Sequence, residues 1–336
     1  MPPIVRTLLT RGVPLLALYL VVLGLIGAGI IDAYWMATLA LICVNIVLAV
    51  SLNLITGFTG QFSLGHAGFM AIGAYATAII SNAVAGPAGF LGGLLAGGVL
   101  AALVGFLIGL PTLRLRGDYL AIATLGMAEI IRVVFVNLDS VTNGAAGLTV
   151  TQNMDWNWFF VLTVGSVILI RNYLRSRQGR DAIAVREDEI AAESIGVDTT
   201  RAKVMSFTIG AFFGGLGGGM YASYFYFIKP DLFGFLKSID ILVIVVLGGL
   251  GSLSGSIIAA ILLALISTLL QGFTEIRMIL YALLLVVIMI FRPEGLMGSR
   301  ELSLNVFSRL GRRRPALATA QAAPGASEAQ GKGDER

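Results

Sequence analysis

Long apolar stretches follow one another along almost the whole chain, and they limit the possible folds more than any other feature. Most are about 17–25 residues long, the length of helix that crosses a hydrocarbon layer of ~30 Å. Lipid offers no hydrogen-bond partners, and these stretches do not alternate as barrel strands do, so we expect an all-α, polytopic membrane helix bundle. The predicted spans are 14–31, 36–55, 62–82, 89–111, 118–137, 157–173, 204–228, 238–251, 254–271 and 276–291.

The number of crossings is about ten, with eight to ten compatible with the pattern. Segment 238–251 is shorter than the others and ends in glycines, so it is either a full crossing or a re-entrant, broken helix. The composition agrees with a membrane protein: 57% of the residues are hydrophobic and 12% are charged, whereas soluble domains carry about 25% charged residues. The excess of apolar side chains must therefore contact lipid.

The basic residues indicate the orientation. If ten spans alternate, most of the 23 Lys and Arg residues fall on one side, including Arg6, Arg11, Arg114 and Arg116. The positive-inside rule places that side in the cytoplasm. It holds the N-terminal segment 1–13, the loop 174–203 and the tail 299–336, which is rich in Ala, Gly, Pro and charge and is expected to be disordered. Because the basic residues flank apolar segments, they indicate topology rather than binding of nucleic acid.

The sequence also argues against several kinds of chemistry. It contains no G-x-x-x-x-G-K-[ST] phosphate loop, so ATP could act only through a partner subunit. Its single cysteine, Cys43, excludes a disulfide framework, and His66 is the only histidine, so we expect no metal site. The first apolar stretch is long for a signal sequence and lacks a clear cleavage site, so we expect an uncleaved span. No soluble segment is large enough to be an enzyme.

The least apolar stretch between two spans is "GFTGQFSLGHAGF", residues 57–69, which we call the glycine strip. One interpretation is a plain turn between the second and third spans, in which glycine supplies positive φ. The other is a broken helix whose free carbonyls and polar side chains line a path, since irregular backbone at membrane depth must face protein or water. The candidates for a translocation path are Asn53, Gly57, Gly60, Gln61, Ser63, Gly65, His66 and Gly68.

The loop 174–203 contains "REDEIAAESIGVD", which has the features of a short amphipathic helix. Acidic residues crowd its expected start, where they favour the positive end of the helix dipole, and a glycine follows as a stop. Its small, flat face suits docking into a partner, but a solvated connector explains the pattern equally well. The candidate coupling residues are Glu187, Glu189, Ala191, Ala192, Glu193, Ile195 and Gly196.

Two ionisable residues lie inside a predicted span. Glu129 and Arg132 are three positions apart, so they can pair on one face of a helix. Ionisable groups in a membrane are expensive and are often functional. Pairing alone, however, would lower the cost of burying them without any role in transport.

Several long motifs together resemble the permease subunit of branched-chain amino acid ABC importers, the LivM type. They are "SLNLITGFTGQFSLGHAGFMAIGAY", "RGDYLAIATLGMAEIIRVV", "GRDAIAVREDEIAAESIGVDTTRAKVMSF", "VVLGGLGSLSGSIIAA" and "FRPEGLMG", and the resemblance covers about residues 36–298. It implies the fold of an ABC importer permease, with a transmembrane domain over 14–298, in a bacterial inner membrane. The implied partners are a second, related permease, two ATPases that carry ATP and Mg, and a periplasmic protein that delivers leucine, isoleucine or valine. This chain would bind no cofactor.

The resemblance also bears on the residues. Glu193 and Gly196 match an "EAA…G"-like segment that docks on an ATPase, and the glycine strip matches the family signature and becomes a candidate for the path. The loop "TNGAAGL" has Ala145 and Ala146 where relatives often carry more polar residues, which argues against a contact with substrate there. A urea or short-chain amide permease shares the signature and remains an alternative. A channel or secondary transporter is a further one, although such a carrier would need more carboxylates than Glu129 inside the membrane.

Overall fold

The computed structural model describes residues 16–17, 19–84, 86–113, 115, 117–152, 154–270, 279, 283, 286, 290 and 295–298. The N-terminal segment 1–13, the tail 299–336 and Arg6, Arg11, Arg114 and Arg116 lie outside the described residues. The last predicted span, 276–291, lies outside them except at four positions, and the first is described as helical at 16–17 and 19–27.

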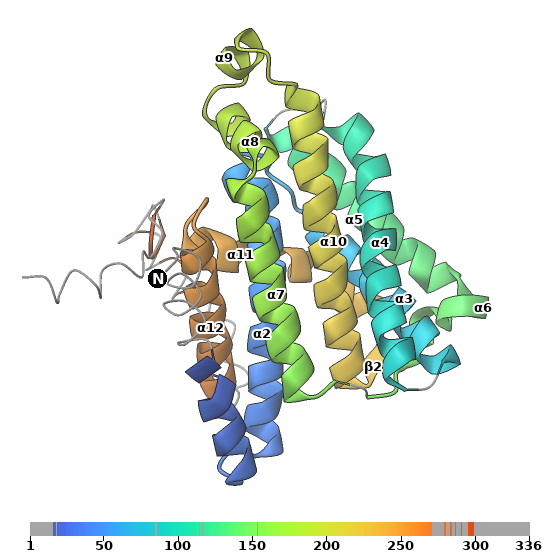
Figure 1. The fold of residues 1–336 in the computed structure, drawn as a ribbon. Helices are drawn as coiled ribbons and strands as arrows, with labels where there is room; N and C mark the ends of the chain where they lie inside the picture. Colours follow the sequence, from blue (N-terminus) through green and yellow to red (C-terminus); the bar gives the residue numbers. More distant parts are fainter. Residues whose placement is uncertain are drawn as a thin grey trace, which may run out of the picture. The chain divides into compact units, whose positions relative to one another are not determined.

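Helices make up nearly all of the described chain (Figure 1). The long helices are α2 (Ala33–Asn53), α3 (His66–Ala83), α4 (Pro87–Thr112), α5 (Asp118–Asn137), α7 (Trp156–Arg175), α10 (Thr199–Phe225), α11 (Phe235–Gly248) and α12 (Leu253–Leu269). The shorter ones are α6 (Asp139–Thr142), α8 (Arg177–Glu187) and α9 (Glu189–Ser194), with a π-helix η1 (Leu54–Phe58) and 3₁₀ turns η2 (Gly144–Ala146) and η3 (Pro230–Phe233). Two short strands, β1 (Leu148–Thr149) and β2 (Phe227–Ile228), pair antiparallel, with Leu148 opposite Ile228.

The helices begin where the sequence supplies a suitable first residue or cap. Pro87 starts α4, where its missing N–H costs no hydrogen bond. The side chains of Ser176, Asp198 and Ser252 cap α8, α10 and α12 by accepting backbone N–H groups of the first turn. Because Asp198 caps α10, this helix starts at Thr199, five residues before the apolar span predicted from 204.

Four described helices are long and apolar enough to cross a membrane: Ala33–Phe58, which includes η1, Pro87–Thr112, Asp118–Asn137 and Trp156–Arg175. The prediction of an all-α, polytopic bundle is therefore confirmed. The 14 residues of α11 rise by about 21 Å, which is less than the ~30 Å of a hydrocarbon layer. The expected span 62–82 is helical only from His66, because residues 59–65 are irregular.

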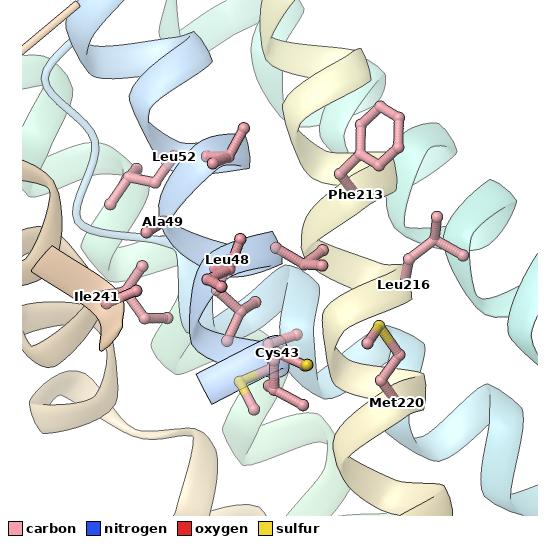
Figure 2. Close-up of a cluster of buried hydrophobic side chains, with 14 of the residues drawn as sticks. Cys43, Leu48, Ala49, Leu52, Phe213, Leu216, Met220 and Ile241 are labelled. Carbon is pink, nitrogen blue, oxygen red and sulfur yellow. The ribbon is translucent and has the colours of Figure 1, made fainter. Parts of the chain in front are cut away.

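The core lies around α2 and α10. Figure 2 shows side chains of α2, among them Leu48 and Leu52, between Phe213 and Leu216 of α10 on one side and Ile241 of α11 on the other. All of them are buried, so most of α2 lies inside the protein rather than against lipid. Burial on every side explains why the sequence of α2 shows no polar face.

Glycines bring α3, α4 and α10 into backbone contact. A Cβ on Gly73 of α3 would lie 1.9 Å from the carbonyl oxygen of Gly215 in α10, and a Cβ on Gly218 would lie 1.9 Å from that of Met70. A Cβ on Gly97 of α4 would lie 2.8 Å from the carbonyl oxygen of Gly73. Small residues allow this close approach between membrane helices, and at these positions no other residue fits.

Candidate functional site

The glycine strip begins within the helix formed by α2 and η1 and ends within α3. The α-helical hydrogen bonding of α2 ends at Asn53 and continues as η1 through Phe58, so Gly57 lies in a π-helical turn. Residues 59–65 are irregular, and α3 begins at His66. Thr59, Gln61, Ser63 and Gly65 are buried, so protein rather than water surrounds most of this irregular backbone. The strip therefore has the geometry expected for a broken helix, with a tight turn at its exposed tip.

Asn53, the last residue of α2, is fully buried and ties this helix to the loop between α11 and α12. Its Nδ2 donates to the carbonyl oxygen of Ser252 at 2.9 Å and to Oγ of Ser256 at 2.7 Å. Its Oδ1 accepts the backbone N–H of Gly251 at 2.9 Å. These three hydrogen bonds fix the position of the 249–252 loop against the end of α2.

Gly57 lies where Asn53 and this loop meet. A Cβ at this position would lie 1.7 Å from Oδ1 of Asn53 and 2.4 Å from the backbone nitrogen of Gly251. Both atoms are engaged in the same hydrogen bond, so neither can move away without breaking it. Only glycine therefore fits at residue 57.

Polar groups of the strip are only partly satisfied by the surrounding protein. Oγ1 of Thr59 donates to the carbonyl oxygen of Leu54 at 2.9 Å, and Nε2 of Gln61 donates to that of Lys203, in α10, at 3.1 Å. Three buried side-chain atoms of this region have no hydrogen-bond partner within the described chain: Oγ1 of Thr56, Oε1 of Gln61 and Nδ1 of His66. Buried polar atoms without partners are rare and call for a specific explanation, such as a ligand or water.

His66 is fully buried at the first position of α3. Its Nε2 lies 2.8 Å from Oγ of Ser51, which itself donates to the carbonyl oxygen of Leu48 at 2.8 Å. Because the hydroxyl proton of Ser51 is engaged, we assign Nε2 as the donor and Nδ1 as a free acceptor. A Cβ on Gly214 of α10 would lie 3.1 Å from the ring, which is therefore closely packed.

Neighbouring helices enclose the start of α3. A Cβ on Gly65 would lie 2.4 Å from the carbonyl oxygen of Thr124 in α5, and a Cβ on Gly68 would lie 3.0 Å from Cα of Ala128. The backbone N–H of Ala67 donates to Oγ of Ser238 in α11 at 3.1 Å. The glycines of the strip thus serve close packing against α5, and the N–H of Ala67 is not free to bind an anion.

Arg186, near the end of α8, contacts the strip and was not among the candidate site residues named from the sequence. Its Nη1 donates to the carbonyl oxygen of Gly57 at 2.8 Å. Its side chain also lies against Gly60 and Gly251. These contacts join three segments that are far apart in the chain.

The segment expected to form one helix from "REDEIAAESIGVD" forms the end of α8 and the whole of α9 instead. The break comes at Asp188, whose side chain accepts the N–H groups of Ile190 and Ala191 at 2.9 and 3.0 Å and so caps α9. Glu187 therefore ends α8 rather than starting the second helix. The predicted stop at Gly196 is confirmed: its φ is +87°, and the N–H groups of Gly196 and Val197 bond back to Glu193 and Ala192 in a Schellman motif.

The exposed face of this region differs from the predicted one. Ala192 is buried against Val185 and Ala202, whereas Ile190 and Ile195 are 76% and 78% exposed, next to the exposed Ala191. Ile190 was missed because the sequence pattern does not show where the helix breaks. Two ion-assisted contacts hold α9 against α10: Nζ of Lys203 donates to Oε1 of Glu189 at 2.6 Å, and Oγ1 of Thr199 donates to Oε1 of Glu193 at 2.9 Å.

The pair expected inside the fifth span is present. Nε of Arg132 lies 2.7 Å from Oε2 of Glu129, and its Nη1 lies 3.4 Å from Oδ1 of Asp231 in η3. The three side chains are between 29% and 67% exposed, so this cluster is at the surface of the described chain. The packing of η3 against α5 could not be anticipated from the spacing in the sequence.

Among the described residues, no group of three or more His, Cys, Asp or Glu side chains is arranged to hold a metal ion. The expectation that this chain carries no cofactor is not tested by the structure.

Comparison with known proteins identifies the family. The sequence model of the branched-chain amino acid transport system permease component matches residues 34–291. The chain is 37% identical to the high-affinity branched-chain amino acid transport system permease protein LivM of Salmonella typhimurium over 308 residues, which are 81% of this chain and 71% of LivM. The figures for LivM of Escherichia coli are the same. The permease protein LivH of Escherichia coli is 29% identical over 161 residues, which are 47% of this chain and 51% of LivH.

No solved structure matches this protein. The family match covers most of the chain and includes the glycine strip, α8 and α9. The 37% identity to LivM extends over 81% of this chain, a level that establishes common descent. The chain therefore belongs to the family of permease components of branched-chain amino acid transport systems.

Proposed function

We propose that this chain is the permease subunit of an ATP-driven importer that moves leucine, isoleucine and valine into the cytoplasm across a bacterial inner membrane. The observation that carries the proposal is the family membership, together with two large exposed apolar side chains, Ile190 in α9 and Ile195 directly after it. ATP and Mg would be bound by separate ATPase subunits, since the sequence has no phosphate loop of its own.

The surface of α9 supports docking rather than a solvated connector. Ile190 and Ile195 are large apolar side chains with more than three quarters of their surface exposed. Ile190 lies in the six-residue helix α9 and Ile195 follows directly after it. This helix is held in place by Asp188, Lys203 and the Schellman turn. An ordered, exposed apolar patch of this kind is typical of a protein interface. On this proposal the α8–α9 end lies in the cytoplasm, as the basic residues of the loop predict.

The glycine strip is the proposed part of this chain that contributes to the translocation path. The support is its irregular, protein-enclosed backbone and the three buried polar atoms without partners, on Thr56, Gln61 and His66. Zwitterionic amino acids carry both charges themselves and need hydrogen-bond donors and acceptors more than a fixed protein charge. Free acceptors such as Nδ1 of His66 and Oε1 of Gln61 could bind an ammonium group in another conformation of the strip.

The complete importer would contain a second permease. LivM and LivH are both named as permease proteins of a high-affinity branched-chain amino acid transport system, and this chain is similar to each of them. We propose that this chain pairs with a LivH-like subunit, with two ATPases on the α9 side and a substrate-binding protein on the opposite side.

Reconstitution tests the proposal. This chain is co-expressed with a LivH-like permease, two ATPases and a binding protein from its own genome, and uptake of labelled leucine, valine and urea into vesicles is measured with and without ATP. We expect ATP-dependent uptake of leucine and valine only. Uptake of urea in place of the amino acids would assign a different substrate class. Uphill uptake by this chain without ATPases would show a secondary transporter.

A variant of the same complex tests the role of α9. Gly196→Pro removes the N–H that bonds to Glu193 and cannot adopt a φ of +87°, so it destroys the turn that ends α9. We expect uptake and ATPase binding to fall while the permease still inserts into the membrane. A variant that transports leucine and retains its ATPases as the wild type does would show that α8 and α9 only connect α7 to α10.

A further inference from the structure

Arg186 occupies a slot that three glycines form. Its Nη1 donates to the carbonyl oxygen of Gly57 at 2.8 Å. A Cβ on Gly60 would lie 3.2 Å from Cγ of Arg186, and a Cβ on Gly251 would lie 2.5 Å from its Nη1. Both glycines have positive φ, +74° and +84°, so the backbone turns away on each side of the guanidinium group. The slot fits an extended, flat side chain and leaves no room for any side chain from the surrounding loops.

The slot joins the end of α8, next to α9, to the glycine strip and to the loop between α11 and α12. Arg186 is the residue before the last of α8, and α9 follows directly after Asp188. Gly57 and Gly60 belong to the glycine strip, and Gly251 belongs to the loop between α11 and α12. Asn53 binds this loop independently through Gly251 and Ser252, so the loop is held both by the hydrogen bonds of Asn53 and by packing against Arg186, which itself bonds the strip.

The carbonyl oxygen of Gly57 can accept this bond because the regular α-helix has already ended. A buried carbonyl group that lacks its helical partner must find another donor, and the loss of that donor costs the full desolvation of the group. Arginine suits the position because its guanidinium group is planar and always charged, and its donors are fixed in one plane. A lysine would bring a compact ammonium group on a flexible stem and would bond the carbonyl without filling the slot.

We propose that Arg186 is a positioning residue that transmits movement of α8 and α9 to the glycine strip and to the 249–252 loop. This inference rests on the proposed function, because it takes the α9 surface to bind an ATPase. When an ATPase displaces α9, the end of α8 moves with it, and the guanidinium group carries the carbonyl of Gly57 and the adjacent loop in the same direction. The coupling then acts on the two irregular segments of the described chain nearest to α8, rather than on the packed helices.

The test uses the complete importer with Arg186→Met, Arg186→Lys and a matched control, Arg180→Gln. Arg180 lies on the same helix, and its Nη1 also donates to a backbone carbonyl oxygen, but to that of Arg175 at the end of α7. The measurements are the assembly and thermal stability of the complex, the ATPase rate stimulated by the loaded binding protein, and leucine uptake. The ratio of the stimulated ATPase rate to the rate of leucine uptake gives the number of ATP molecules hydrolysed per leucine transported.

For Arg186→Met we expect assembly and stimulated ATP hydrolysis to persist while uptake falls on the order of tenfold, the size of a typical coupling between two sites. The ATP used per leucine rises accordingly. The leucine uptake of Arg186→Lys should lie between that of Arg186→Met and that of the wild type. The uptake of Arg180→Gln should equal that of the wild type. If Arg186→Met does not assemble, the ATP used per leucine by Arg186→Lys tests the inference instead, since lysine keeps the charge and the approximate length of arginine.

Two results would overturn the inference while leaving the proposed function intact. One is an unchanged ratio of hydrolysis to uptake in both Arg186 variants of an active importer. The other is a parallel loss of stability, hydrolysis and uptake, which would give Arg186 a structural role only. A wild-type complex without ATP-dependent leucine uptake would instead contradict the proposed function, and the inference with it.

Discussion

Replacement of Asn53 by alanine tests how strongly the end of α2 is tied to the loop between α11 and α12. The change removes three hydrogen bonds, to the N–H of Gly251, the carbonyl oxygen of Ser252 and the hydroxyl of Ser256. A typical hydrogen bond contributes about 0.5–1.5 kcal/mol net, and those between membrane helices average about 0.6 kcal/mol. Three bonds therefore give an expected loss of about 2–4 kcal/mol in the free energy of unfolding.

A second asparagine of α2 provides the matched control. Asn45 is also buried, but its Oδ1 has no hydrogen-bond partner within the described chain. Asn45→Ala removes the same atoms from the same helix, so it controls for the loss of volume and for any change in helix propensity. We expect it to cost about 1 kcal/mol or less. Both variants are compared with the wild type by SDS titration of the purified permease in mixed micelles, followed by circular dichroism.

The difference between the two variants is the decisive quantity. A gap of about 2 kcal/mol or more would support the three-bond junction at Asn53. If the two variants unfold at free energies within about 0.5 kcal/mol of each other, the hydrogen bonds of Asn53 contribute nothing beyond burial, and the reasoning from this junction is wrong.

Three further substitutions test other contacts. Gly65→Ala places a Cβ 2.4 Å from the carbonyl oxygen of Thr124, so it should lower both the thermal stability and uptake, whereas Gly126→Ala, which meets no atom within 4 Å, should change neither; equal effects would refute the close packing. His66→Gln keeps a hydrogen-bonding side chain, so leucine uptake should persist with an unaltered pH profile, and a shifted pH optimum would indicate proton-linked gating instead. Arg132→Gln breaks a partly exposed ion pair, so the free energy of unfolding should fall by less than about 1 kcal/mol in a thermal unfolding assay; a larger fall would show that the pair has a structural role.

The positions of the helices could be predicted well from the apolar stretches. The expected span 118–137 coincides with α5, and 157–173 differs from α7 by one or two residues at each end. The start of α10 was missed because its first turn is polar and depends on the cap formed by Asp198. Hydropathy reports removal from water, into lipid or into the protein core, whereas a helix begins where its backbone N–H groups find partners.

The candidate site could be predicted only in part. The glycine strip was recognisable as the least apolar stretch between two spans, and Gly196 because it follows a short amphipathic segment. Arg186 and Ser51 were not, since each acts on a residue distant in the chain and no periodicity marks such a contact. The sequence offers only one indication of the role of Arg186, its position two residues before Asp188, which caps α9. Gly65 was a candidate for the path, but a larger side chain at this position would push against the backbone of α5, because even a Cβ overlaps Thr124.

The backbone contacts among α3, α4 and α10 restrict how this protein can change shape. Where these helices touch through Gly73, Gly97, Gly215 and Gly218, backbone meets backbone directly, so at these points no side chain can change its rotamer to let one helix slip past another. We therefore expect these three helices to move together as a rigid body. In contrast, α5 buries only Leu120, Ala121, Thr124 and Ala128. We therefore expect bending in a transport cycle at segments that flank these three helices, such as the irregular residues 59–65, where backbone dihedral angles can change without separating α3, α4 and α10 from one another.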